Sequence, residues 1–161
     1  MFIKFAIYIS KISFLRKNLF LKKFLKIISK IIVKLIYGRY KKISIGNKYT
    51  FLIDSNFALR NFENWGGSHN RGFTKLLDIS KNKKVVFDIG AHIGLCTLPL
   101  SHLVSTVVSF EASPVNVKYL YKHLKINNIN NGNVVPYLVD KENIKNADFY
   151  DVDDGLGIPS I

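Results

Sequence analysis

The first stretch of the chain mixes lysines with large apolar side chains in a helical rhythm. From residue 23 the lysines fall at positions 23, 26, 30 and 34, which gathers them on one face of a helix. Apolar residues fill the rest of that helix: Phe24, Leu25, Ile27, Ile28, Ile31, Ile32 and Leu35. The pattern predicts a basic amphipathic helix within residues 1–38, with Gly38 as its stop.

Farther along the chain, short apolar runs alternate with helical patterns. Two strands of a hairpin about Gly46-Asn47 are expected at 41–45 and 49–53, followed by a loop over 54–70 and a short helix ending near Lys81. Three further strands are expected at 84–88, 106–110 and 133–139, separated by helices at about 93–103, kinked at Pro99, and 113–127. The compact apolar run at 84–88 is typical of a buried parallel strand.

The order strand, helix, strand, helix, strand predicts an α/β fold. It corresponds to half of a doubly wound, Rossmann-like sheet, preceded by the basic helix and the hairpin. We therefore divide the chain into a helical segment at 1–38, a hairpin and loop at 39–70, and the first part of an α/β domain at 71–161.

Two hydrophobic stretches look like membrane spans without meeting the requirement for one. Within residues 1–38 the longest uncharged run between basic residues is Phe5 to Ser10, whereas a span needs about 20 mostly apolar residues. Residues 89–110 carry no Asp, Glu, Lys or Arg, but glycines, serines and a proline interrupt them. We expect a loop, a helix and a strand there.

The charge distribution adds a possible partner for the N-terminal helix. The chain has 24 Lys plus Arg and 11 Asp plus Glu, a net charge of +13, and no acidic residue precedes Asp54. A basic arm on a neutral body argues against a uniformly basic nucleic-acid-binding domain. Peripheral contact of residues 1–38 with an anionic membrane is favoured over packing of their apolar side on the body, and over binding of RNA or DNA phosphates.

Cysteine and histidine usage gives no support to a metal site. Cys96 is the single cysteine, which excludes an intrachain disulfide and fits a reduced, cytoplasmic setting. His69 and His102 have no partners at a recognised ligand spacing, and the acidic residues near 151–154 favour a solvated loop over a cation site. Trp65, beside two glycines, is expected to pack under the sheet rather than flank a ligand.

The candidate chemistry follows the ends of the three predicted parallel strands. Asp88 ends the first of them, and Gly90 and Gly94 follow at plus two and plus six, a spacing that suits a tight turn and close packing at a helix start. Glu111 and Asp140 end the next two strands, so acids meet at the edge where open α/β sheets bind ligands. A dinucleotide dehydrogenase is disfavoured because no glycine stands two residues after Gly90.

These motifs resemble FkbM-type S-adenosylmethionine-dependent methyltransferases, a class I methyltransferase family. The resemblance covers roughly residues 84–150 and rests on the Asp-x-Gly-Ala-His-Ile-Gly loop at 88–94, with 110–114, 127–129 and 139–140. By resemblance, Glu111 would hold the ribose, Asp140 would approach the adenine, and the methionine-side loop would comprise Asp88, Gly90, Ala91, His92 and Gly94. The family usually has Asn at the position of His92 and Pro at that of Ala112.

The resemblance implies methyl transfer from the cofactor S-adenosylmethionine to an oxygen of a small molecule or glycan. No catalytic residue is indicated, and His92 is expected to line the cofactor rather than act as a base. Family members carry a seven-stranded sheet, whereas this pattern stops after about the third strand, which implies a truncated domain with an uncovered apolar face. The alternative is a non-catalytic fragment whose basic helix binds membranes. Nucleic acid is disfavoured as a partner, and no oligomeric state is indicated.

Overall fold

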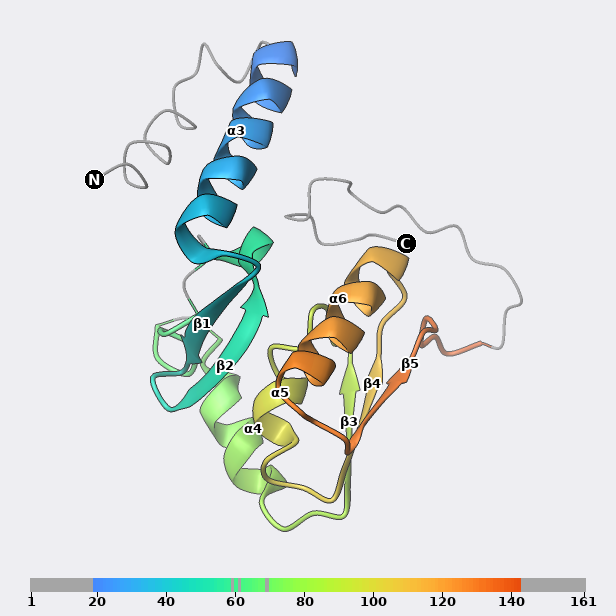
Figure 1. The fold of residues 1–161 in the computed structure, drawn as a ribbon. Coiled ribbons are helices and arrows are strands. Elements are labelled where there is room, and N and C mark those ends of the chain that lie inside the picture. The colour runs from blue at the N-terminus through green and yellow to red at the C-terminus, as the bar shows by residue number, and fades with distance from the viewer. Residues whose placement is uncertain (1–18, 59, 61, 69, 143–161) are drawn as a thin grey trace.

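The computed structural model describes residues 19–142 except 59, 61 and 69. The chain begins with helix α3 (Leu19–Tyr37) and an antiparallel hairpin, β1 (Tyr40–Ile45) and β2 (Tyr49–Asp54). A short 3-10 helix, η1 (Ser55–Phe57), and helix α4 (Gly72–Ser80) lead into the parallel unit. That unit runs β3 (Val85–Ile89), α5 (Thr97–Leu100), β4 (Thr106–Phe110), α6 (Pro114–Ile126) and β5 (Gly132–Val135) (Figure 1).

The fold is α/β with a parallel three-stranded sheet, preceded by a helix and an antiparallel hairpin, as the sequence predicted. Strand order is β3-β4-β5, and β4 pairs in parallel with both neighbours. The expectations for residues 151–154, for His69 and for the first 18 residues lie outside the described part of the chain.

The beginning of the fold follows the predicted pattern closely. Gly38 ends α3 with a left-handed φ of 66°, and its N–H donates to the Lys34 carbonyl at 2.8 Å. The hairpin turns at Gly46 and Asn47, which both have positive φ, as a tight hairpin turn requires. Its inner face is buried in the main hydrophobic core and comprises Ile43, Ile45, Phe51 and Ile53.

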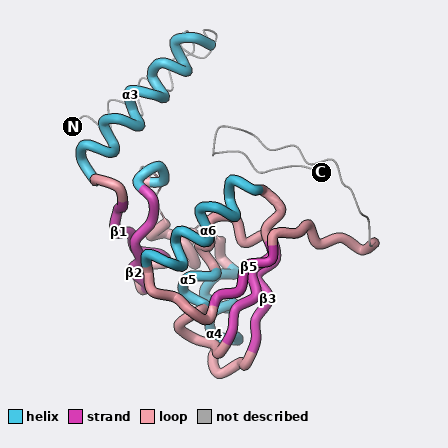
Figure 2. Tube along the Cα trace, turned by 45° about the vertical axis from the view of Figure 1, so that its right-hand side comes forward, coloured by secondary structure: helices cyan, strands magenta, loops and turns pink. Residues whose placement is uncertain are grey.

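The parallel sheet is covered on one face. Helix α6 lies between the sheet and the hairpin (Figure 2), and Val107 of β4 and Leu120 of α6 are fully buried there. The opposite face of β3 is apolar and exposed: Val85, Phe87 and Ile89 keep 50%, 63% and 64% of their surface. The expectation of a buried strand at 84–88 is therefore wrong for this face, and the uncovered apolar face expected from a half-sheet is present.

Two prolines shorten elements that were predicted to be longer. The helix expected over about 93–103 is regular only at Thr97–Leu100; Pro99 has no N–H to donate to the carbonyl of Leu95, so regular helix does not extend back toward residue 93. The strand expected over 133–139 ends at Val135, because Pro136 cannot continue the ladder. Asp140 consequently lies five residues beyond the strand instead of at its end.

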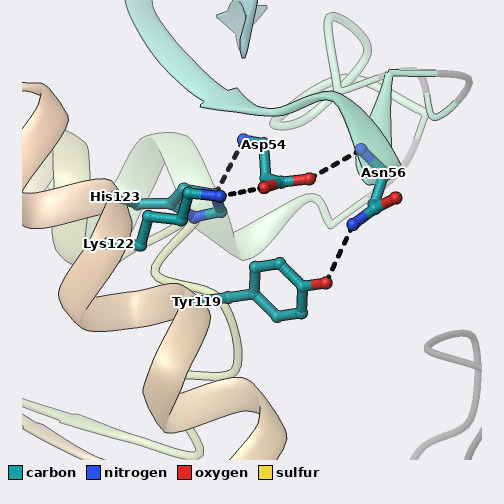
Figure 3. A network of polar contacts seen from close by, with 5 residues as sticks. All are labelled: Asp54, Asn56, Tyr119, Lys122 and His123. Atoms are coloured by element: carbon teal, nitrogen blue, oxygen red, sulfur yellow. Dashed lines mark hydrogen bonds and ion pairs between the residues drawn. The ribbon is translucent and has the colours of Figure 1, made fainter. Parts of the chain in front are cut away.

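A buried polar network fixes the hairpin to α6 (Figure 3). The Asp54 N–H donates to His123 Nε2 at 2.9 Å, and the Asp54 carboxylate pairs with Lys122. Asn56 Nδ2 donates to the Tyr119 hydroxyl at 2.9 Å. Since Nε2 of His123 accepts a hydrogen bond, Nδ1 carries the proton and donates to the carbonyl of Ile93 at 2.8 Å. A neutral histidine thus joins the hairpin, α6 and the loop that follows β3.

Candidate functional site

The loop after β3 takes its shape from three left-handed backbone positions. Gly90, His92 and Gly94 have φ values of 77°, 52° and 96°. The N–H groups of Gly90 and Ala91 both donate to the carbonyl of Phe110 at 2.9 Å, which fixes the turn to the end of β4. The sequence between Asp88 and Gly94 therefore forms a tight loop at the carboxyl edge of the sheet.

The two glycines of this loop serve different purposes. A Cβ on Gly94 would lie 2.7 Å from Cδ1 of Leu120, so this glycine is needed where the loop packs against α6. A Cβ on Gly90 would meet nothing within 4 Å, so the backbone there faces open space. Gly90 is accordingly the point of the loop where a ligand can approach the main chain.

Asp88 presents a partly buried carboxylate beside the loop. Its Oδ2 accepts a hydrogen bond from the Thr97 hydroxyl at 2.6 Å, and the Thr97 and Ser109 hydroxyls are 2.9 Å apart. Burial raises the pKa of the Asp88 carboxyl, and the negative charge of Glu111 raises it further, while the Thr97 hydrogen bond opposes both. Thr97 holds the carboxylate in one orientation toward the loop.

Glu111 is 7% exposed and is engaged within the chain. Its Oε2 accepts from the His92 N–H at 2.7 Å, and its Oε1 accepts from the Ser113 N–H at 2.9 Å and Asn116 Nδ2 at 3.3 Å. A carboxylate has about four acceptor positions, so roughly one remains on Oε2. Glu111 therefore supports the left-handed position of His92 and can take a single further donor, not a pair.

A pocket of about 430 Å³ opens beside the loop. Its lining combines the loop residues Asp88, Gly90, Ala91, His92, Leu95 and Cys96 with a facing segment formed by Arg60, Phe62 and Trp65. The indole of Trp65 contacts the rings of Phe62 and Phe73 edge-on, with centroid distances of 6.2 and 5.4 Å. Trp65 therefore packs against the hydrophobic core, as expected of a structural residue, and also forms a wall of the pocket.

The facing segment was missed by the sequence reading. Arg60 and Phe62 lie in a stretch without a periodic pattern, and the glycines after Trp65 gave the one local signal. Only the packing of the hairpin and its following loop against the α/β unit brings these residues opposite Asp88.

Burial disfavours the charged forms of His92 and Cys96 in the pocket. Burial lowers the pKa of His92, the positive charge of Arg60 lowers it further, and Glu111 works in the opposite direction. Burial raises the pKa of the Cys96 thiol to about 12, which disfavours the thiolate at neutral pH. Within the described residues no cluster of three or more His, Cys, Asp or Glu side chains is arranged to bind a metal ion.

Asp140 does not join the group of site residues. It is exposed, and its Oδ1 accepts from the Lys141 N–H at 2.6 Å. Neither Asp140 nor Glu111 lines the pocket, but Glu111 is hydrogen-bonded to the loop through the His92 N–H. The carboxyl ends of β3 and β4 bring Asp88 and Glu111 together, whereas the early end of β5 leaves Asp140 apart. Of the three acids predicted to meet at this edge of the sheet, only Asp88 and Glu111 therefore lie close together.

These features define a Rossmann-like α/β unit with a glycine loop and a ligand-sized pocket at the carboxyl edge of its sheet. No family model matches the chain. Over 121 residues it is 29% identical to tRNA(Phe) (4-demethylwyosine(37)-C(7)) aminocarboxypropyltransferase of Methanocaldococcus jannaschii, a match over 74% of this chain and 46% of that protein. The chain thus spans about half the length of this curated relative.

Solved structures with a similar fold include M. jannaschii TYW2 in complex with AdoMet, which is 24% identical with a TM-score of 0.44 over 60% of this chain and 42% of that one. M. jannaschii tRNA m1G37 methyltransferase is 17% identical, with a TM-score of 0.45 over 66% of this chain and 33% of that one. The FkbM assignment is not supported by these matches.

Proposed function

We propose that this chain is the cofactor-binding part of an S-adenosylmethionine-dependent transferase. The observation that carries the proposal is the pocket at the end of β3, where Asp88, the open backbone at Gly90 and the ring of Trp65 face one space. Its volume, about 430 Å³, lies in the usual range of roughly 300–1,000 Å³ for small-molecule sites.

The residues present fit the chemistry of this cofactor. The Asp88 carboxylate would accept from the ammonium of the methionine part, and the guanidinium of Arg60 would meet its carboxylate across the pocket. Glu111, with about one acceptor position left, would take one ribose hydroxyl while its other bonds hold the loop. Asp140 has no place in this arrangement, so its proposed contact with the adenine is dropped.

When bound, the cofactor supplies an electrophilic carbon attached to a sulfonium sulfur. The chain's own contribution is to hold that group in one orientation and to line the space around it with Phe62, Trp65 and Leu95, which limits access of water. His92, whose pKa is lowered, contributes a neutral imidazole at neutral pH. No acceptor-side residue emerges among the described residues, so the roles assigned here stop at cofactor binding.

The group transferred and its acceptor are a finer part of the proposal. The resemblance to FkbM-type methyltransferases implied a methyl group and a small-molecule or glycan acceptor, whereas the name of the M. jannaschii relative specifies an aminocarboxypropyl group and a tRNA. We favour tRNA as the acceptor because the name of this relative, which is 29% identical to the chain, specifies tRNA(Phe). Cofactor labelled either on the methyl or on the carboxyl carbon distinguishes the groups, since methyl transfer leaves only the first label on the acceptor.

The position of Trp65 provides a direct test of the cofactor class. It is the chain's single tryptophan and forms a wall of the pocket, so a ligand bound there changes its fluorescence. We expect S-adenosylmethionine and S-adenosylhomocysteine to give a saturable change, and NAD to give none at the same concentration. A saturable response to NAD alone would contradict the proposal and favour a dinucleotide site.

A further inference from the structure

Helix α3 turns its apolar side away from the rest of the protein. The exposed residues Phe24, Ile27, Ile31 and Leu35 follow one another at spacings of three and four, which places them on one helical face. Their exposed fractions are 52%, 58%, 53% and 80%. Ile32 and Ile36, also exposed, widen this face, which we call the outer face of α3.

The opposite side of α3 makes the contact with the body. Val33 is the buried side chain of the helix, with 6% of its surface exposed, and α3 packs there against η1. Val33 is two positions from both Ile31 and Leu35, which turns it about 200° away from them. The helix projects beyond the hairpin (Figure 1, Figure 2), so packing of its apolar side on the body, the alternative weighed from the sequence, is excluded for the described residues.

The charges beside the outer face have a single sign. Lys30 and Lys34 are exposed and lie one turn apart along its border. No acidic residue occurs before Asp54, and the Asp54 carboxylate is paired with Lys122. The outer face is therefore apolar in the middle and positive at its edge.

We propose that α3 binds an anionic membrane surface, lying in the interface with its outer face among the acyl chains and its lysines at the headgroups. A helix of this pattern meets both requirements of such a surface, apolar burial and negative charge. A second copy of α3 would cover the apolar residues but bring further lysines and no acid to compensate them. An RNA would compensate the lysines but leave Phe24, Ile31 and Leu35 in water.

The orientation of α3 also determines where the hairpin and the α/β unit lie when the helix is bound to a membrane. Because Val33 and η1 lie on the side opposite the outer face, the hairpin and the α/β unit remain outside the bilayer when α3 lies in its surface. No described helix is long and apolar enough to cross a membrane, in keeping with a helix that lies on one. The proposal is independent of the cofactor site.

The test is cosedimentation of the full 161-residue chain with lipid vesicles. Vesicles of phosphatidylcholine with phosphatidylglycerol are compared with phosphatidylcholine alone, and Leu35→Asp is compared with Ile79→Asp. Ile79 lies on α4 and is 55% exposed, so the control makes the same change of charge at another exposed apolar position. Circular dichroism establishes that both variants fold like the parent chain.

We expect the chain and Ile79→Asp to bind the anionic vesicles at least about tenfold more tightly than the neutral ones, and Leu35→Asp to lose about tenfold or more of that affinity. Equal binding to both vesicle types, or full binding by Leu35→Asp, would overturn the proposal. A dimer in light scattering that Leu35→Asp dissolves would identify a second copy as the occupant instead. RNA would be identified as the partner if Lys30→Glu loses binding to both vesicles and tRNA while Leu35→Asp keeps both.

Discussion

His92 carries a bulky side chain at a backbone position that few residues tolerate. Its φ of 52° is left-handed, and the N–H is held there by Glu111 at 2.7 Å. Asparagine adopts this region several-fold more readily than most residues, whereas a β-branched residue is strongly disfavoured in it. We expect His92→Asn to keep the free energy of unfolding within about 0.5 kcal/mol and His92→Val to lower it by about 1–3 kcal/mol.

Chemical denaturation of the two variants measures this difference directly. Equal stability of the valine and asparagine variants would contradict the left-handed geometry of the loop.

His123 gives the protein a pH dependence of known sign. Burial lowers the pKa of this histidine, although its bond to the Ile93 carbonyl and the Asp54 charge oppose the change. The folded state therefore binds a proton less readily than the unfolded state, whose histidine titrates near 6.5. As pH falls below about 6.5, protons bind preferentially to the unfolded chain, and the free energy of unfolding decreases.

We expect unfolding measured between about pH 5 and 8 to show this loss of stability in the parent chain. His123→Gln is expected to be less stable at pH 8 but to lose much of the slope, because the titrating group is gone. His102→Gln, a change at an exposed histidine, serves as the control and should retain the slope. An unchanged slope in His123→Gln would show that other groups, such as His92, carry the effect.

The residues that sequence reasoning found are those whose role is local. Asp88, Gly90 and Gly94 are recognisable because a strand end, a turn and a helix start follow each other within seven residues. His123 and Arg60 were missed because their roles depend on distant partners: the Asp54 N–H that His123 accepts lies 69 positions away. No periodic pattern reports such a contact.

The connection between β3 and α5 depends on the missing side chain of Gly94. Alanine there would place its Cβ 2.7 Å from Leu120 and would have to adopt a φ of 96°. We expect Gly94→Ala to lower the free energy of unfolding by about 2–4 kcal/mol, combining overpacking with backbone strain. Gly72→Ala is the matched control, because its Cβ would meet nothing within 4 Å at the start of α4.

Thermal or denaturant unfolding of both glycine variants measures this difference in the free energy of unfolding. Gly72→Ala should be neutral or slightly stabilising. A Gly94→Ala variant as stable as Gly72→Ala would mean that α6 does not pack against the loop as described.

Elements were predicted well where local chemistry and tertiary packing agree. The hairpin turn, the strand Thr106–Phe110 and the helix started by Ser113 and Pro114 appear as expected, and the Ser113 side chain accepts from the Asn116 N–H. The predicted lengths of α5 and β5 were wrong because the apolar runs continue through Pro99 and Pro136, neither of which has an N–H to donate. Proline outweighs hydrophobic pattern at both places.

The whole molecule has one hydrophobic core and one apolar sheet face outside it. The hairpin, α4 and the covered side of the sheet share that core, which includes Phe51, Phe73 and Leu120. The pattern along β3 would favour burial of the wrong side, because the exposed side is fully apolar, with Val85, Phe87 and Ile89, whereas the covered side carries Asp88. The side that is buried is set by α6 and its contacts to Asp54 and Leu52.

Substitutions on the two faces of the sheet should therefore change the free energy of unfolding by very different amounts. Phe87 is 63% exposed on the uncovered face, and we expect Phe87→Thr to change the free energy of unfolding by less than about 1 kcal/mol. Leu120 is fully buried on the covered face, and Leu120→Ala should cost about 2–5 kcal/mol. Denaturation that shows a large loss for Phe87→Thr would mean that this face is covered in solution.

Calorimetric titration of S-adenosylmethionine into the 161-residue chain tests whether the pocket at the end of β3 binds this cofactor. Asp88→Asn removes the charge in the pocket, and Asp78→Asn removes an exposed charge on α4 as the control. We predict saturable binding by the chain and by Asp78→Asn, and binding weaker by about tenfold or more in Asp88→Asn. No binding by a folded chain, or equal binding by both variants, would contradict the assignment of this pocket to the cofactor.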